Sequence, residues 1–132
     1  MKYLLDTQII VWMIENPNKL TKEVRNIIDS TTAIYISIES LREIVIKQQS
    51  NDILIKVSFA KFCEILKEYG VKIINTEINH ILAFEKLNTN PNHKDPFDHL
   101  IISVAISGKF TLISSDHKMP YYTNQGLQLI EN

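Results

Sequence analysis

Short apolar runs alternate with stretches of helical spacing along this chain, and that alternation limits the possible folds more than any other feature. We expect strands at residues 2–5, 33–37, 71–74, 111–114 and 128–130. We expect helices at residues 8–15, 21–28, 39–49, 55–68, 77–87 and 96–107. Strands that are apolar on both faces and separated by helices are typical of parallel sheets covered by helices. The sequence therefore predicts a three-layer α/β/α sandwich with a mostly parallel sheet of four to five strands.

Length and composition predict one domain over residues 1–132. The chain has 132 residues, of which 45% are hydrophobic, and no segment is dominated by Pro, Ser or Gly. No run approaches the ~18 apolar residues of a transmembrane helix, and Asp6 interrupts any secretory signal. Cys63 is the only cysteine, which excludes an intramolecular disulfide and fits a reducing compartment. We therefore expect a cytoplasmic protein that is not held at a membrane.

Two acids lie where parallel strands are expected to end. Asp6 directly follows the first strand, and Asp116 follows the fourth strand after Ser115. Ligands of open parallel sheets bind outside the carboxyl ends of the strands, so both acids are candidates for a site. Helix capping is the alternative, because Asp at a strand-to-helix junction commonly accepts a backbone N–H. Position alone leaves both interpretations open.

A third acid, Asp98, lies at the start of a helix that is apolar on nearly all sides. Asp95 followed by Pro96 is a usual helix start, with the aspartate as the N-cap. Asp98 is in line with the apolar positions of this helix, which indicates that it points inward. It can simply favour the positive helix N-terminus. Because Asp95 already supplies a cap, however, a second inward acid indicates another partner.

Helical spacing gives a weaker indication for Glu43. The apolar side of its helix carries Leu41, Ile44 and Val45, which places Glu43 on the opposite side with Lys47. Spacing favours an i,i+4 ion pair with Lys47 on a solvated face. A helix in a three-layer domain can still direct that side over the sheet edge, so a role in a site stays open.

Several carboxylates that meet at one point repel one another and raise each other's pKa unless a cation neutralises them. Oxygen ligands suit Mg²⁺ or Mn²⁺, and such ions support phosphodiester hydrolysis. The formal net charge of −1 does not exclude a nucleic acid partner. If four acids bind metal, the rest of the chain carries more basic than acidic residues.

Other chemistries find less support. The chain has no G-x-x-x-x-G-K-[ST] or G-x-G-x-x-G loop for a nucleotide and no G-x-S-x-G element for a serine nucleophile. The four histidines lack the i,i+4 spacing of zinc ligands, and one cysteine cannot complete a zinc site. We expect His80 to be partly buried on its helix, and His93, His99 and His117 to lie in loops or at a helix start.

Four segments make the chain resemble the PIN-domain family, and within it the VapC-type toxins of toxin–antitoxin pairs. The segments are LLDTQ at residues 4–8, residues 37–47, HKDPFDHLII at residues 93–102 and LISSD at residues 112–116. The D-P-F-D block is the most specific of them. The resemblance covers nearly the whole chain and implies a PIN-like fold, a Mg²⁺ or Mn²⁺ site and endoribonuclease activity.

Carried over position by position, the resemblance implies four acids that bind metal and catalyse the reaction. They are Asp6, Glu43, Asp98 and Asp116. Thr7 and Ser115 match polar positions beside the metal. Asp95 matches the first acid of its block; we assign it mainly to capping, with a lesser role in supporting the metal ligands.

The resemblance also implies the partners of the protein: an RNA substrate, a cognate antitoxin protein that shields the site, and a second copy in a homodimer. Lys47 and Lys94 are our candidates for contacts with substrate phosphates. Many relatives carry Trp and Arg where this chain has Arg42 and His99, and His where it has Gln8. None of these departures removes a predicted metal ligand, so they bear on the choice of substrate rather than on the reaction.

The sequence is compatible with two alternatives to a nuclease. One is a catalytically idle PIN-like binding module, whose acids serve only as caps and ion pairs. The other is an aspartyl phosphatase, which normally has a second acid two residues after the first, where this chain has Gln8.

Overall fold

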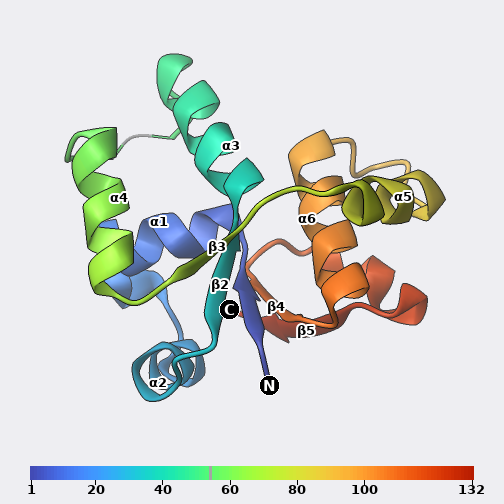
Figure 1. Ribbon diagram of the computed structural model, residues 1–132, viewed down its shortest axis with the longest axis horizontal. Coiled ribbons are helices and arrows are strands. Elements are labelled where there is room, and N and C mark those ends of the chain that lie inside the picture. The colour runs from blue at the N-terminus through green and yellow to red at the C-terminus, as the bar shows by residue number, and fades with distance from the viewer. Residues whose placement is uncertain (54) are drawn as a thin grey trace.

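The computed structural model describes residues 1–53 and 55–132, which form a sheet with helices on both sides (Figure 1). In chain order the elements are β1 (Tyr3–Leu5), α1 (Thr7–Glu15), the 3₁₀ helix η1 (Pro17–Lys19), α2 (Lys22–Ser30), β2 (Ile34–Ser37), α3 (Ile38–Gln49), α4 (Phe59–Glu68), β3 (Lys72–Ile74), α5 (Ile78–Lys86), α6 (Pro96–Gly108), β4 (Thr111–Ser114), the 3₁₀ helix η2 (Met119–Gln125) and β5 (Gln128–Glu131). The α/β alternation that the sequence predicts is confirmed.

The sheet has five strands in the order β3-β2-β1-β4-β5, and every neighbouring pair is parallel. The sequence predicts a mostly parallel sheet, and the sheet of the structure is parallel throughout. After β1 the chain builds β2 and β3 on one side and then returns to place β4 on the other side of β1. This change of direction is a topological switch point, where ligands of parallel sheets usually bind. Asp6 follows β1 there, and Asp116 lies two residues beyond β4.

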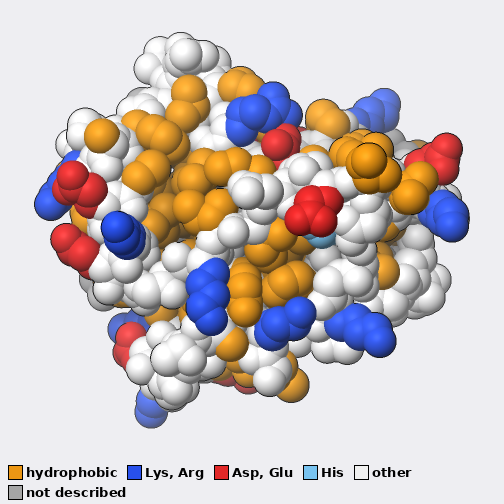
Figure 2. Space-filling view, in the orientation of Figure 1, with side chains coloured by type: hydrophobic (Ala, Val, Ile, Leu, Met, Phe, Trp, Pro, Cys, Tyr) orange, Lys and Arg blue, Asp and Glu red, His pale blue; other side chains and the backbone are white. Residues whose placement is uncertain are grey.

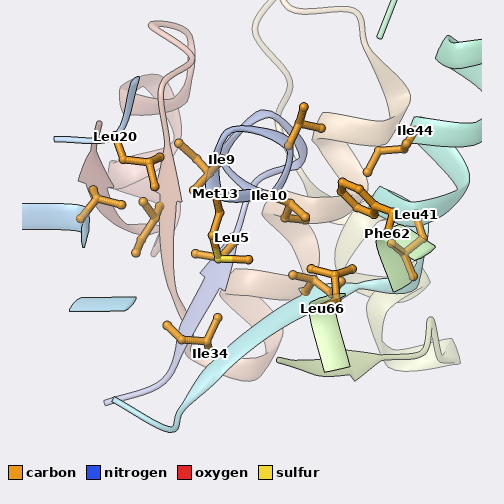
Figure 3. Close-up of a cluster of buried hydrophobic side chains, with 14 residues drawn as sticks. Leu5, Ile9, Ile10, Met13, Leu20, Ile34, Leu41, Ile44, Phe62 and Leu66 are labelled. Atoms are coloured by element: carbon orange, nitrogen blue, oxygen red, sulfur yellow. The ribbon is translucent and has the colours of Figure 1, made fainter. Parts of the chain in front are cut away.

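The two faces of the sheet contact separate apolar clusters. Leu4 and Leu5 are both fully buried but belong to different clusters, because successive side chains of a strand point to opposite faces. Figure 3 shows the cluster that contains Leu5, with side chains from α1 and α4 pointing toward one another. The other cluster lies between the sheet, α6 and η2. Burial on both faces explains why the strands are apolar without alternation.

Local capping fixes the helix starts, and it corrects one predicted boundary. The carboxylate of Asp95 accepts the backbone N–H of Phe97 at 2.9 Å, which confirms its assignment as a cap. The helix predicted over residues 55–68 begins only at Phe59, because the Ser58 hydroxyl caps it by accepting the backbone N–H of Lys61 at 3.1 Å. Ile55 precedes that cap and packs against the core without being helical.

The end of α6 also differs from the expectation. The sequence predicts that this helix ends at residue 107; it continues through Gly108, and Lys109 adopts the left-handed conformation with φ of 56°. A Cβ on Gly108 would collide with the ring of Phe110. The glycine is therefore explained by the close approach of that ring rather than by its own dihedral angles.

No helix within residues 1–53 and 55–132 has both the length and the apolar character needed to cross a membrane.

Candidate metal centre

A pocket of about 300 Å³ opens at the switch point, at the carboxyl ends of β1 and β4. Its lining includes six acids: Asp6, Glu43, Asp52, Asp95, Asp98 and Asp116. Among the described residues that line it, Lys47 is the one Lys or Arg. The four acids that the sequence analysis named therefore face one pocket, although they come from four separate segments of the chain.

Asp6 lines this pocket and is held by hydrogen bonds to both of its carboxylate oxygens. It is 6% exposed and caps α1, with Oδ1 accepting the backbone N–H of Thr7 at 2.8 Å. Its Oδ2 accepts the hydroxyl of Ser114 at 2.6 Å, and the same hydroxyl oxygen accepts the backbone N–H of Asp116 at 3.0 Å. Ser114 thus links the acids after β1 and β4. Sequence reasoning named Ser115 but missed Ser114.

Glu43 is 3% exposed, so the solvated face that helical spacing favoured for it is wrong. The predicted ion pair with Lys47 does exist, with Nζ 2.6 Å from Oε2. The other carboxylate oxygen, Oε1, lies 2.5 Å from the Thr7 hydroxyl, which in turn lies 3.0 Å from the Ser40 hydroxyl. Helix α3 packs against both α1 and α6, which turns its polar side toward the pocket rather than toward solvent.

Asp98 projects from the first turn of α6, as its place in the sequence predicts. Its Oδ2 lies 2.9 Å from Nε2 of His93, a residue that is 2% exposed and that sequence reasoning left in a loop. The same ring nitrogen lies 3.6 Å from Oδ2 of Asp116. His93 was missed because loop residues carry no periodic signal; the available clue was its place in the same sequence block, five residues before Asp98.

Two groups of ligand atoms lie close enough to share a cation. They are Glu43–Asp95–Asp98 and His93–Asp98–Asp116, and within each group the ligand atoms lie within 4.8 Å of one another. Asp98 belongs to both groups. Asp6 lines the same pocket, but the structure places it in neither group.

The charges of these acids are poorly tolerated without a cation. Burial, followed by the charges of neighbouring acids, raises the pKa of Asp6 and of Asp98 to about 7. Partial burial alone would lower the pKa of Lys47, but its contacts with Glu43 and Asp95 raise it. One lysine cannot balance this many carboxylates. An oxygen-rich set of buried and half-buried acids fits a divalent cation such as Mg²⁺ or Mn²⁺.

Thr7, one of the supporting residues named from the sequence, donates its hydroxyl to Glu43. Asp95, another, caps α6 with Oδ1, while its Oδ2 lies 3.4 Å from Nζ of Lys47. Ser115 lines the pocket. Lys47 is engaged by Glu43 and Asp95, which limits its availability to a substrate. Lys94 is exposed and is not part of the pocket lining.

The raised pKa values lead to a pH-dependent prediction. Between about pH 4 and pH 7 the folded, metal-free protein retains protons on Asp6 and Asp98 that the unfolded chain has lost. The stability that these two groups contribute is therefore present at low pH and is lost as pH rises toward 7. A dication must displace those protons when it binds. The affinity of the protein for the dication should therefore increase with rising pH, by up to about tenfold per pH unit for each proton released.

Thermal unfolding with Mn²⁺ and with EDTA, at pH 6 and pH 8, measures this effect. We expect Mn²⁺ to raise Tm more at pH 8 than at pH 6, and Asp98→Asn to reduce the difference. Equal increments at both pH values in the unmodified protein would contradict the proton–metal competition.

Fold and site together define a class: parallel α/β proteins with a cluster of acids, suited to a divalent cation, at the switch point of the sheet. Within that class the chain belongs to the PIN-domain family, because residues 3–124 match the PIN domain. The resemblance seen in the four sequence segments is thereby confirmed. No curated protein matches the chain significantly.

Several solved structures share this fold, and three of them illustrate the similarity. VapBC2 from Rickettsia felis, bound to a DNA fragment from its promoter, has a TM-score of 0.68 at 20% identity, covering 99% of this chain and 98% of that one. DNA-bound VapBC from Salmonella typhimurium has a TM-score of 0.66 at 12% identity, with coverage of 99% and 98%. FitAcB from Neisseria gonorrhoeae has a TM-score of 0.65 at 13% identity, with coverage of 98% and 96%.

Proposed function

We propose that this protein is a Mg²⁺- or Mn²⁺-dependent endoribonuclease that hydrolyses RNA phosphodiester bonds. Asp6, Glu43, Asp98 and Asp116 are its metal-binding and catalytic acids. The observation that carries the proposal is the convergence of these four acids on one pocket at the switch point, with a single lysine among them. In a PIN domain, such a pocket requires a cation before it can accept the negative charge of a phosphodiester.

The contacts of each acid indicate its proposed role in binding the metal. Asp98 uses one oxygen to contact His93, and its position in both ligand groups makes it the central metal ligand. Asp116 completes one group, and Asp6 lines the same pocket outside both groups. When bound, the dication supplies positive charge that stabilises the phosphoryl oxygens during hydrolysis.

Glu43 differs from the other acids because both of its oxygens already have close partners, Thr7 and Lys47. We assign Glu43 to orienting the attacking water and to adding negative charge near the cation. Lys47 is already held by its ion pair with Glu43, so it is only a secondary candidate for a phosphate contact. Lys94, outside the pocket, is a candidate for a more distant phosphate of the strand.

In the cell we propose that the protein acts in the cytoplasm as the toxin of a type II toxin–antitoxin pair, with residues 1–132 as one nuclease domain. The shared fold with VapBC and FitAB proteins supports a cognate antitoxin as partner. Homodimer formation is supported by apolar side chains exposed on α5: Ile78, Ile81 and Leu82 are 78%, 50% and 53% exposed. Figure 2 shows apolar side chains gathered over α5, and exposed patches of this kind commonly mark interfaces.

An idle binding module is the second candidate, and one observation favours it. Asp6, Asp95 and Asp116 each accept a backbone N–H, as acids with purely capping roles would. Caps and ion pairs do not explain why four acids converge on one pocket that Lys47 alone cannot neutralise, so we prefer the nuclease. An aspartyl phosphatase is weaker still, because Gln8 occupies the position of its second acid.

Incubation of the purified protein with total RNA, with Mg²⁺, with Mn²⁺ or with EDTA, tests the proposal. We expect discrete cuts in the presence of either metal, mapped by sequencing of the new ends, and none with EDTA. Binding of Mn²⁺ without any cleavage would favour the idle module. Cleavage that persists in EDTA would contradict metal dependence.

A further inference from the structure

A buried imidazole lies directly behind the pocket. His93 is 2% exposed and is absent from the residues that line the pocket, yet its Nε2 lies 2.9 Å from Oδ2 of Asp98. On the opposite side of the ring, Nδ1 lies 3.0 Å from the hydroxyl of Tyr122, a residue that is fully buried. The imidazole therefore connects the interior of the protein to the acid that both ligand groups share.

The direction of these hydrogen bonds follows from the partners. The form of Asp98 that binds a cation is the carboxylate, which can only accept, so Nε2 of His93 carries the proton and donates. In a neutral ring Nδ1 then accepts, and it does so from the Tyr122 hydroxyl. The Tyr122 oxygen in turn accepts the backbone N–H of Asn90 at 3.2 Å.

The loop that carries His93 is fixed independently of any ligand. The backbone oxygen of His93 lies 2.6 Å from Nε2 of His99, and its backbone N–H donates to the Asn90 carbonyl at 2.8 Å. Earlier in the loop, the backbone N–H of Asn88 donates to the side-chain oxygen of Gln125 in η2, and the side-chain amide of Gln125 donates to the backbone oxygen of Asn88. His99 is one of the positions at which this chain departs from the family pattern, and here its side chain secures the backbone of residue 93.

We propose that His93 is a positioning residue: through the chain Tyr122–His93–Asp98 it holds Asp98 in the orientation that binds the cation. The inference rests on the proposed metal-dependent function. Hydrogen-bonded partners behind a metal ligand fix its orientation and typically contribute 10- to 100-fold to metal affinity.

A direct bond from His93 to the metal is the competing interpretation, since its Nε2 lies within 4.8 Å of ligand atoms of Asp98 and Asp116. Two observations favour positioning. The separation of 2.9 Å from Asp98 is an ordinary N–H···O distance. The ring also lies outside the pocket lining, whereas both acids line it.

Mn²⁺ titration of variants tests the proposal. We expect His93→Leu to weaken Mn²⁺ binding about 10- to 100-fold, and His93→Gln, whose amide N–H can reach Asp98, to restore most of the affinity. Tyr122→Phe, which removes only the hydroxyl, should weaken binding about two- to tenfold. The matched controls His80→Gln and Tyr121→Phe lie outside this chain of contacts and should leave the affinity unchanged.

Two spectroscopic measurements distinguish the outcomes. In pulsed electron paramagnetic resonance of the Mn²⁺ complex we expect no coupling to an imidazole nitrogen; coupling that disappears in His93→Gln would make His93 a ligand and overturn the proposal. Unchanged Mn²⁺ affinity in His93→Leu would overturn it as well. If the unmodified protein binds no Mn²⁺, the proposed function fails instead. In that case ¹⁵N NMR of the metal-free protein at pH 8, above the raised pKa of Asp98, decides the inference, which requires a protonated Nε2 and an unprotonated Nδ1. The opposite tautomer at that pH would contradict it.

Discussion

Replacing Asp98 with Asn should reduce the rate of RNA cleavage by more than about a hundredfold, because it removes the negative charge of a metal ligand. Residues that only support such ligands already contribute 10- to 100-fold to metal affinity or activity, so the loss of a ligand charge should cost more. Asn keeps the volume of the side chain and an oxygen that can still accept from His93. The fold should therefore survive, and the metal-free protein should be at least as stable at pH 8, since a carboxyl with a raised pKa is lost. Initial cleavage rates at saturating Mg²⁺, with circular dichroism of the same samples, measure both effects.

The matched control is Asp29→Asn, which makes the same chemical change at an exposed position of α2. It should leave both the cleavage rate and the Mn²⁺ affinity unchanged. Asp6→Asn should behave like Asp98→Asn, although Asp6 lies outside both ligand groups. Undiminished cleavage by both site variants would refute the assignment of the site.

Truncating Phe62 to Ala should lower the free energy of unfolding by about 3–5 kcal/mol, the usual cost of removing a fully buried aromatic side chain. Phe62 lies on α4 and packs in the same cluster as Leu41 and Ile44 of α3, the helix that carries Glu43 (Figure 3). Typical domains have only about 5–15 kcal/mol of stability in total, so this loss is large. Urea denaturation provides the measurement.

Tyr69→Ala, at the end of the same helix, is the control for that truncation. Tyr69 is 50% exposed, and its removal should change stability by no more than about 0.5 kcal/mol. Equal losses in the two variants would mean that α4 does not depend on the core cluster as the structure indicates.

Local signals in the sequence predicted most of the architecture. Apolar runs separated by helical spacing were sufficient for the parallel sheet, and Asp95-Pro96 marked the start of α6. The start of α4 was missed because Ile55 and Val57 continue the apolar spacing while packing against the core outside a helix. The weak cap signal of Ser58 was outweighed by that pattern.

The site was predictable to a smaller extent, because its residues meet only through tertiary packing. Asp6 and Asp116 could be placed from the ends of their strands, and Asp98 from its helix. Glu43 could not, since periodicity reports which side of a helix is apolar but not which neighbouring element covers its polar side. The family resemblance, not spacing, identified it.

Ser114 and His93 were missed for a related reason. Ser114 is the last residue of a buried strand, and nothing in its neighbourhood distinguishes it from the adjacent Ser115. His93 lies in a loop whose conformation is set by contacts with Tyr122 and His99. Polar side chains fixed by such long-range contacts leave no periodic trace in a single sequence.

Diffraction from crystals grown with Mn²⁺, recorded for anomalous scattering, most directly tests whether distant acids of this chain share a cation. We expect an anomalous peak in the pocket, roughly 2.0–2.5 Å from an oxygen of Asp98 and from an oxygen of Asp6 or Asp116. A pocket without such a peak at saturating Mn²⁺, or a peak only at other carboxylates, would contradict the proposed metal centre and the nuclease mechanism that depends on it.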